Sequence, residues 1–283
     1  MTDRFRTAIL GLGLMGGSLA YALRGFKDGI IVGYDPDEAT QKAALKAGAV
    51  DAIAFLPEEA VKKADLVLFC SAPSGIFANM PRCFPHLKPG AVVSEICGVK
   101  GEMLRFVQQH LPSHARYVGL HPMAGKEIGG FANAEGALFQ GAGFILVPPE
   151  PHDESALALL RALSAYVGAG RVVVNDAAAH DLLIGYSSDL MHIAATALVE
   201  EYPCGLSLAH TAGAFRDCTR VARIDAKLWR ELLLGNAESI TPHLDALAAR
   251  LAAFSAALKA GDGAFIESFL SRANENRLRI DKL

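Results

Sequence analysis

The sequence predicts an α/β domain built on a parallel sheet, followed by an all-helical domain. Seven short β-branched or aliphatic segments, each bounded by Gly, Pro or Asp, recur through the first part of the chain. Segments with helical periodicity lie between several of them. Beyond residue 176 the chain is rich in Ala and Leu, and no further strand is predicted. These observations together define the expected fold class.

The predicted strands are apolar along most of their length, which indicates burial on both faces, as in a parallel sheet covered by helices. They are 7–13, 29–35, 64–73, 91–98, 116–122, 143–149 and 171–176. Helices are predicted at 16–26 and 37–48, and the second of these is opened by acidic residues and closed by Gly48. The alternation favours a doubly wound α/β domain over residues 1–174.

Residues 175–283 are expected to form an all-α domain. Long helical patterns cover 176–202, 241–261 and 264–283. Ala-rich helices that follow a complete α/β domain often bury their faces against a second subunit, so we expect a homodimer. A helical cap on a monomer is the alternative.

The composition is that of a globular protein without a strong charge bias. The 283 residues are 52% hydrophobic and 20% charged, with a formal net charge of −3. This charge gives no general attraction to nucleic acid or to an anionic membrane, and we expect neither as a partner. No signal peptide and no apolar run long enough to span a bilayer are predicted, so a cytoplasmic location is expected. Five scattered cysteines without metal-binding spacing predict reduced thiols and no metal site.

A glycine-rich loop joins the first predicted strand to the first predicted helix. Its sequence is Gly11-Leu12-Gly13-Leu14-Met15-Gly16. Gly11 permits the tight turn, Gly13 lets the backbone approach a pyrophosphate, and Gly16 lets the helix pack on the strand. The helix N-terminus then faces the phosphate. Because the motif lies in the required strand-loop-helix context, it predicts a Rossmann-like dinucleotide-binding domain, with these glycines, Leu14 and Met15 at the cofactor.

An acidic residue closes the second predicted strand. Asp35 follows Gly11 by 24 positions, where a carboxylate accepts hydrogen bonds from the adenosine ribose. A carboxylate there repels a 2′-phosphate, and no Arg or Lys follows immediately, so NAD is favoured over NADP. Ser71 and Ala72 lie at the end of the third predicted strand, on the same sheet edge, where small residues let the backbone approach the cofactor. An ordinary strand-to-helix turn is the alternative for these two residues.

Two further segments carry a resemblance to a known family. They are GLHPMAGKEIGG at 119–130 and FRDCTRVARIDAKLWRELLLGN at 215–236. Together with the glycine loop, they resemble the prephenate/arogenate dehydrogenase family over nearly the whole chain. The resemblance implies a Rossmann-like domain followed by an all-helical dimerisation domain. It also implies NAD(P)-dependent oxidative decarboxylation, of prephenate to 4-hydroxyphenylpyruvate in tyrosine biosynthesis or of arogenate to tyrosine.

Three residues are expected to act on the substrate. His121 follows a strand end that faces the cofactor crevice, and a neutral imidazole there can polarise the ring hydroxyl during hydride transfer. Arg220 matches the family's substrate-binding arginine, and its guanidinium suits a carboxylate. His192 matches a histidine that lines the substrate pocket. A surface arginine and a buried, hydrogen-bonded histidine are the alternatives for Arg220 and His192.

The resemblance also implies a gate at the mouth of the pocket. It suggests an ionic network around the arginine, formed partly across a dimer by Glu127, His180, Asp181 and Asp217. Trp229, the sole tryptophan, matches a residue that reaches toward the partner's site. A core aromatic residue is the alternative there.

The chain departs from the family pattern at three places. Gly98 stands where many members have a serine, so a hydroxyl near the reacting ring is absent. Asp189 replaces a histidine, and Lys126 replaces a serine or threonine. A lysine could attract a dianionic substrate, and an aspartate could bind an ammonium group. These changes leave the choice between prephenate and arogenate open.

Two other functions are compatible with the glycine loop. A β-hydroxyacid dehydrogenase shares the same start, but it needs a lysine followed four residues later by an asparagine, which the second domain lacks. A protein that binds NAD without turnover is the other alternative, and His121 and Arg220 count against it. We therefore expect an NAD-dependent prephenate dehydrogenase, with arogenate dehydrogenase as the nearest alternative.

Overall fold

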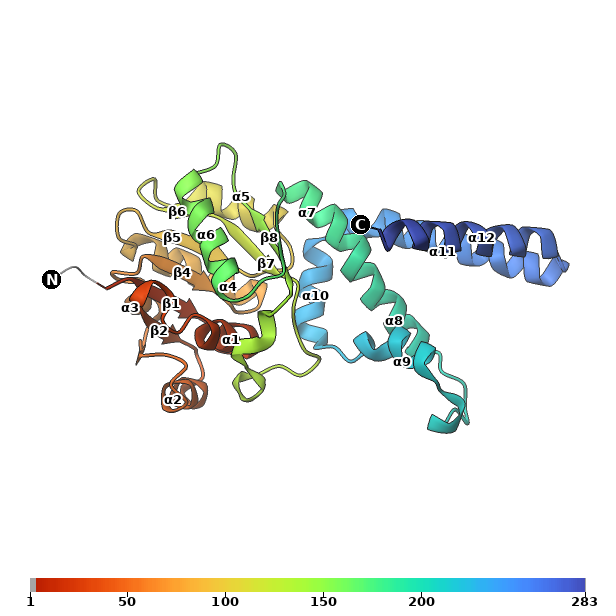
Figure 1. The fold of residues 1–283 in the computed structure, drawn as a ribbon, viewed down its shortest axis with the longest axis horizontal. Coiled ribbons are helices and arrows are strands. Elements are labelled where there is room, and N and C mark those ends of the chain that lie inside the picture. The colour runs from red at the N-terminus through yellow and green to blue at the C-terminus, as the bar shows by residue number, and fades with distance from the viewer. Residues whose placement is uncertain (1–3, 283) are drawn as a thin grey trace. The chain divides into compact units, whose positions relative to one another are not determined.

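The computed structural model describes residues 4–282 and divides into two compact units after Asn236. Each unit is described by itself. The first contains the α/β domain and the helices up to α10, and the second contains α11 and α12 (Figure 1). The predicted order, an α/β domain followed by helices, is confirmed. The domain boundary predicted at residue 174 remains a prediction.

A six-stranded parallel sheet forms the centre of the first unit. Its strands lie in the order β3-β2-β1-β4-β5-β6, so that β1 has both β2 and β4 as parallel neighbours. The strands are β1 (Arg6–Leu10), β2 (Ile30–Tyr34), β3 (Ala52–Ile53), β4 (Leu66–Phe69), β5 (Val92–Glu95) and β6 (Arg116–Tyr117). The short β3 was not predicted.

Helices cover both faces of this sheet, as expected for a doubly wound fold. Alternate residues of β1 enter separate cores: Ile9 packs in one, and Ala8 and Leu10 pack in the other. The helices are α1 (Leu14–Ala22), α2 (Glu38–Lys46), α3 (Pro57–Val61), α4 (Pro73–Cys83), α5 (Gly101–His110) and α6 (Glu154–Tyr166). Short 3-10 turns occur at Phe26–Asp28, Phe84–His86, Phe131–Asn133 and Gly136–Phe139.

A second, three-stranded sheet differs from the prediction. The segment predicted as one strand, 116–122, forms β6 in the large sheet and then β7 (Gly119–Pro122) in the small one. There β7 pairs antiparallel with β8 (Gly143–Val147), which pairs parallel with β9 (Arg171–Val174). The expected burial on both faces is wrong for β9, because all four of its residues are exposed. An apolar strand that nothing covers within the chain has the same sequence pattern as a buried one.

Helices complete the first unit. They are α7 (Ala177–Ile184), α8 (Leu190–Glu200), α9 (Gly213–Thr219) and α10 (Ala226–Gly235), with 3-10 turns at Leu208–His210 and Arg220–Ala222. A π-helical turn, Gly185–Asp189, joins α7 to α8, so the predicted long helix is continuous but not regular. Such turns frequently occur at functional sites.

The continuous stretch Ala177–Glu200 corrects one expectation from the sequence. It is long and apolar enough to cross a membrane by length and composition, and only 28% of its most apolar window is buried. A single helix of this kind does not distinguish a membrane span from a helix that packs within a protein. Its apolar surface includes Leu183, Tyr186 and Leu198, each more than half exposed.

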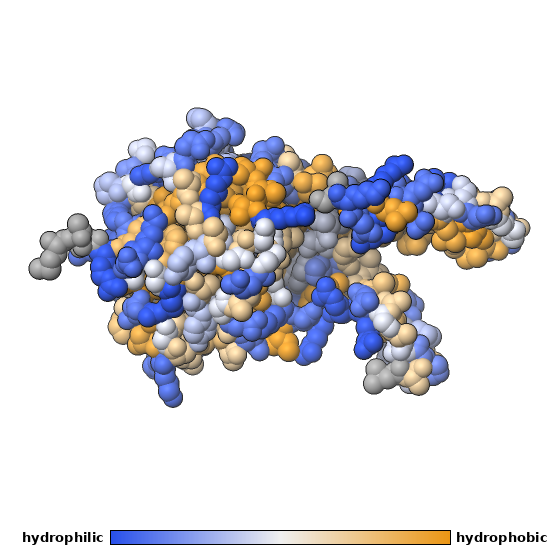
Figure 2. All heavy atoms as spheres, in the orientation of Figure 1, coloured by the Kyte–Doolittle hydropathy of each residue, from blue (hydrophilic) through white to orange (hydrophobic). Residues whose placement is uncertain are grey.

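The second unit is a helical hairpin of α11 (Ala237–Ala260) and α12 (Gly263–Ile280). The two helices contact each other through Phe254 and Phe269, whose ring centroids lie 5.2 Å apart in an edge-to-face arrangement. Large apolar side chains remain on the surface of the pair (Figure 2). Leu251, Leu258 and Leu270 are each more than half exposed. Long helices with uncovered leucines are typical of an interface between subunits.

Candidate active site

The predicted site residues of the α/β domain follow one another along one edge of the large sheet. Strands β1, β4 and β5 are parallel neighbours, so their carboxyl ends meet at this edge. A Cβ atom on Gly11, after β1, would lie 2.8 Å from the backbone nitrogen of Ser71, after β4. A Cβ atom on Gly98, after β5, would lie 3.8 Å from Cε1 of His121. The glycine loop and His121 therefore belong to one continuous rim.

The glycine loop has the close approaches that its sequence predicts. Gly11 has a φ of +96°, and a Cβ atom on Gly16 would lie 1.8 Å from the carbonyl oxygen of Gly11. By contrast, a Cβ atom on Gly13 would meet nothing within 4 Å. Gly13 is the N-cap of α1, no side chain caps this helix, and its first turn contains no acidic residue. The loop therefore leaves open space at a helix N-terminus that can bind an anion.

Asp35 lies beside this loop. Its Oδ2 accepts a hydrogen bond from the backbone nitrogen of Leu12 at 2.7 Å, and its Oδ1 accepts one from Asp37 at 3.0 Å. The carboxylate thus fixes the loop as well as standing where a ribose is expected. Of the other residues predicted at the cofactor, Leu14 is buried, whereas Met15, Ser71 and Ala72 are half-buried. Leu14 can therefore contribute backbone groups rather than its side chain.

His121 is hydrogen-bonded to His180, which is in turn hydrogen-bonded to Asp181. Its Nδ1 lies 2.9 Å from Nε2 of His180, and Nδ1 of His180 lies 2.7 Å from Oδ1 of Asp181. The Asp181 carboxylate also accepts hydrogen bonds from the backbone nitrogens of Lys100 and Gly101, at 2.8 Å each. Both His180 and Asp181 are buried. They form a chain behind His121 and do not contact the arginine of the expected gate.

A buried lysine, Lys100, contacts the strand β7 that carries His121. Nζ of Lys100 donates to Oε1 of Glu95 at 2.7 Å and to the carbonyl oxygen of Leu120, the residue before His121, at 2.9 Å. Tyr117 also donates to Oε1 of Glu95, at 2.7 Å. Neither Glu95 nor Lys100 was predicted from the sequence as a site residue. The available signal was a glutamate inside an otherwise apolar strand, because a buried charge requires a partner.

The surroundings of His121 favour its neutral form. Burial lowers the pKa of His121 well below the ordinary value of 6.5, and the positive charge of Lys100 lowers it further. The ring is therefore uncharged near neutral pH. A neutral imidazole has one nitrogen that can accept a proton.

Arg220 belongs to a second cluster. It lies in the 3-10 turn after α9, and its Nη1 contacts Oε1 of Glu127 at 3.2 Å, as the expected gate requires. His192 on α8 stacks against Trp229 on α10, with ring centroids 3.8 Å apart. Burial lowers the pKa of His192, and the charge of Arg220 adds to this effect. These four residues come from four different segments, and the helices bring them together.

Three further residues of interest do not contact His121 or Arg220 directly. Lys126 forms an ion pair with Glu135 at 2.9 Å within its own loop. Asp217 is exposed on α9. Asp189 is buried, and its Oδ2 accepts a hydrogen bond from Nδ2 of Asn236 at 2.8 Å. Asn236 also donates to the backbone oxygen of Asp181 at 3.0 Å, and no sequence pattern predicted this bridge.

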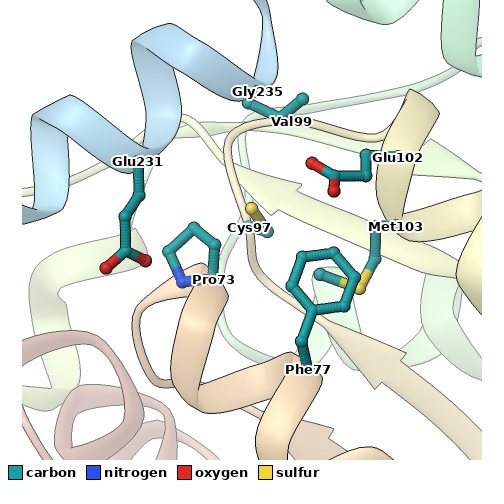
Figure 3. Close-up of a pocket in the computed structure, with 8 residues that line it drawn as sticks. All are labelled: Pro73, Phe77, Cys97, Val99, Glu102, Met103, Glu231 and Gly235. Carbon is teal, nitrogen blue, oxygen red and sulfur yellow. The ribbon is translucent and has the colours of Figure 1, made fainter.

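A small pocket lies between α4, α5 and α10 (Figure 3). Its lining residues are Pro73, Phe77, Cys97, Val99, Glu102, Met103, Glu231 and Gly235. Glu231 also accepts hydrogen bonds from the backbone nitrogen and the hydroxyl of Ser74, at 2.9 Å each. None of the predicted site residues lines this pocket, and its two carboxylates would repel an anionic substrate. Among residues 4–282, no group of three or more His, Cys, Asp and Glu side chains is placed to hold a metal ion.

Comparison with known proteins connects this geometry to a family. Residues 19–174 match the nucleotide-binding domain of prephenate dehydrogenase, and residues 176–271 match its dimerisation domain. The cyclohexadienyl dehydrogenase of Zymomonas mobilis is 30% identical over 99% of this chain and 97% of its own length. The prephenate dehydrogenase of Bacillus subtilis is 31% identical over 84% of this chain and 66% of its own.

A solved structure has a similar fold. The prephenate dehydrogenase of Aquifex aeolicus, crystallised with hydroxyphenyl propionate and NAD+, superimposes with a TM-score of 0.85. Its sequence is 27% identical, and the match covers 98% of this chain and 99% of that one. The predicted nucleotide-binding domain and the predicted family resemblance are confirmed.

Proposed function

We propose that this chain, which belongs to the prephenate dehydrogenase family, catalyses the NAD-dependent oxidative decarboxylation of prephenate to 4-hydroxyphenylpyruvate. The observation that carries this proposal is the state of His121. Its ring stands on the carboxyl edge of the sheet, its Nδ1 is hydrogen-bonded, and its Nε2 lies beside Gly98, which has no side chain. A neutral imidazole with one free nitrogen is the group that this reaction needs.

The glycine loop fits the cofactor that the proposal requires. The pyrophosphate would lie against Gly13 at the N-terminus of α1, where the structure leaves open space. Asp35 would accept hydrogen bonds from the ribose hydroxyls and repel the 2′-phosphate of NADP. Bound NAD supplies the acceptor for the hydride that leaves the substrate. The NAD+ named for the Aquifex aeolicus enzyme supports the same choice.

The substrate itself supplies much of the driving force. Prephenate carries a hydroxyl on the ring carbon that loses hydride and a carboxylate on the opposite ring carbon. As the C–H bond breaks, His121 accepts the hydroxyl proton at Nε2. Loss of the ring carboxylate as CO₂ makes the ring aromatic, and the proton returns to the ring oxygen. The chain therefore needs a base and a means of orienting the substrate, but no nucleophile.

The second cluster is proposed to bind the substrate. Arg220 would bind a substrate carboxylate through a charge-assisted hydrogen bond. That carboxylate would replace Glu127, which forms an ion pair with the guanidinium in this structure. His192 and Trp229 would form an adjacent wall of the pocket. The exposed apolar helices and the family's dimerisation domain support a homodimer. A homodimer would cover part of the apolar surface of α7 and α8. Their apolar character is then consistent with the soluble, cytoplasmic location that we propose.

Arogenate is the alternative substrate. The relative from Zymomonas mobilis is named for the cyclohexadienyl ring, which prephenate and arogenate share. The side-chain keto group of prephenate is an amino group in arogenate. Asp189, a candidate partner for that ammonium group, is buried and hydrogen-bonded to Asn236. Because its carboxylate is already engaged there, prephenate is favoured.

The test is turnover. Purified protein with NAD is mixed with prephenate or, separately, with arogenate, and NADH absorbance is followed. We expect faster turnover of prephenate; faster turnover of arogenate would select the alternative, and no turnover of either would refute both. His121→Asn should bind NAD normally and lose most of kcat, and a near-normal kcat would exclude its role. Arg220→Gln should mainly raise KM, with Arg223→Gln as the matched control.

A further inference from the structure

The chain of hydrogen bonds behind His121 has a definite direction. We infer that His180 and Asp181 fix the tautomer of His121, so that Nδ1 carries the proton and Nε2 is the acceptor for the substrate hydroxyl. His180 and Asp181 are thus positioning residues rather than members of a gate. The inference concerns how the base is prepared, and its importance for turnover rests on the proposed function.

The direction follows from the carboxylate at the end of the chain. Asp181 accepts hydrogen bonds from the backbone nitrogens of Lys100 and Gly101, which begin α5. A helix N-terminus stabilises the anionic form, and an ionised carboxylate can only accept. The third contact, between Oδ1 of Asp181 and Nδ1 of His180 at 2.7 Å, therefore requires that this nitrogen donates.

With His180 neutral, the positions of the remaining protons follow. A neutral His180 that carries its proton on Nδ1 has an unprotonated Nε2, which can only accept. Nδ1 of His121 lies 2.9 Å from that nitrogen, so it must be the donor. The single ring proton of His121 is then on Nδ1, which donates to His180, and Nε2 is unprotonated. If His180 were instead doubly protonated, the direction would reverse and His121 could not act as a base.

The free nitrogen has space in front of it. A Cβ atom on Gly98 would lie 3.9 Å from Nε2 of His121, in ordinary contact, so the missing side chain leaves room beside the ring. Behind the ring, the charged and titratable groups are Lys100, His180, Asp181 and, through Lys100, Glu95. All four are buried, so the chain is shielded from water that could compete for its hydrogen bonds.

The hydrogen bonds from His121 to Asp181 join two parts of the sequence, one in a strand and one in a helix. His121 lies on β7, whereas His180 and Asp181 lie in the middle of α7. Asp181 is held from the other side by Asn236, which donates to its backbone oxygen at 3.0 Å. The orientation of the base is therefore set by the helices and not by the sheet alone.

Three variants test the inference. His180→Phe removes both hydrogen bonds while filling the same space. His180→Gln can restore them, because its amide oxygen accepts from His121 and its amide nitrogen donates to Asp181. His114→Gln replaces an exposed histidine, whose ring is hydrogen-bonded to the backbone oxygen of Leu87 away from the site, and serves as the control. Thermal unfolding and NAD titration of each variant check folding.

The first readout is the tautomer itself, measured from the ring ¹⁵N chemical shifts of histidine-labelled protein. The His121 signals are assigned by their loss in His121→Asn. We expect an unprotonated Nε2 in the wild type, a mixture of tautomers in His180→Phe and the wild-type pattern in His180→Gln. A protonated Nε2 in the wild type, or an unchanged pattern in His180→Phe, would overturn the inference.

The second readout is the pH profile of kcat. We expect kcat to fall by about 10- to 100-fold in His180→Phe, with a displaced acid limb, and to recover largely in His180→Gln. A fall in kcat without a change in the acid limb or in the tautomer would indicate a merely structural role and refute the inference. If neither prephenate nor arogenate is turned over while the tautomer responds as expected, the proposed function fails and the assignment of His121 stands.

Discussion

Replacing Asp189 with asparagine should stabilise the protein in a pH-dependent way. Asp189 ends the π-helical turn, is 4% exposed, and accepts one hydrogen bond, from Asn236. Burial raises the pKa of its carboxyl from 3.8 to about 6; the Asn236 hydrogen bond opposes this shift, and the nearby Asp181 adds to it. The charged carboxylate is therefore destabilising in the folded state.

The size of the effect follows from that shift. The pKa of Asp189 rises from 3.8 to about 6, a little over two units, and each unit corresponds to about 1.4 kcal/mol. Charged Asp189 therefore costs at most about 3 kcal/mol at pH 8, where both folded and unfolded forms are ionised. As the pH falls through 6, the folded form takes up a proton before the unfolded form does, so the wild type gains stability. Below the unfolded pKa of 3.8 the cost has disappeared.

Asp189→Asn removes the charge and keeps an oxygen that can accept from Asn236. We expect the free energy of unfolding in urea to rise by up to about 3 kcal/mol at about pH 8, and the gain to shrink toward zero as the pH approaches 4. Asp217→Asn, at an exposed carboxylate, is the control, and all samples are compared at one protomer concentration. No gain at about pH 8, or a gain that is constant with pH, would refute the reasoning.

Three further predictions concern the cofactor loop and the buried lysine. Gly16→Ala places a Cβ atom 1.8 Å from the Gly11 oxygen, so NAD affinity and the unfolding temperature should both fall; normal values would contradict the packing. Asp35→Ala should reduce the preference for NAD in the ratio of kcat/KM for NAD and NADP, and an unchanged ratio would mean that another group sets the preference. Lys100→Met leaves Glu95 buried without its cation, so the free energy of unfolding in urea should fall by about 3–5 kcal/mol; a loss below about 1 kcal/mol would show that the pair contributes little.

Local patterns were enough to predict most of the fold. The apolar segments and the glycine loop led to the parallel sheet and to α1, because their periodicity and turn residues are set by near neighbours in the sequence. Three features escaped prediction. The segment 116–122 divides between two sheets, and β3 has two residues, too few for any periodicity. The apolar β9 is exposed, since burial depends on what else covers a strand.

The candidate site was predictable in part for the same reason. His121, Arg220 and the glycine loop lie in short motifs, so their identity could be recognised from a few consecutive residues. Their partners could not. His180 lies 59 positions from His121, and Asn236 lies 55 from Asp181, so each pair meets only through the tertiary fold. Resemblance therefore grouped His180 and Asp181 with Arg220, whereas the hydrogen bonds of the structure connect them to His121.

The glycine loop and the His121 ring are fixed by different contacts in this protein. The glycine loop is fixed by Asp35 and by close packing against Cys70 and Ser71, which follow β4. The orientation of His121 depends instead on His180 from α7 and, through Asp181, on the first turn of α5. Because the two sets of contacts share no residue, they can fail separately. A substitution in the loop should weaken NAD binding and leave the His121 tautomer intact, whereas one at His180 should change the tautomer and leave NAD binding intact.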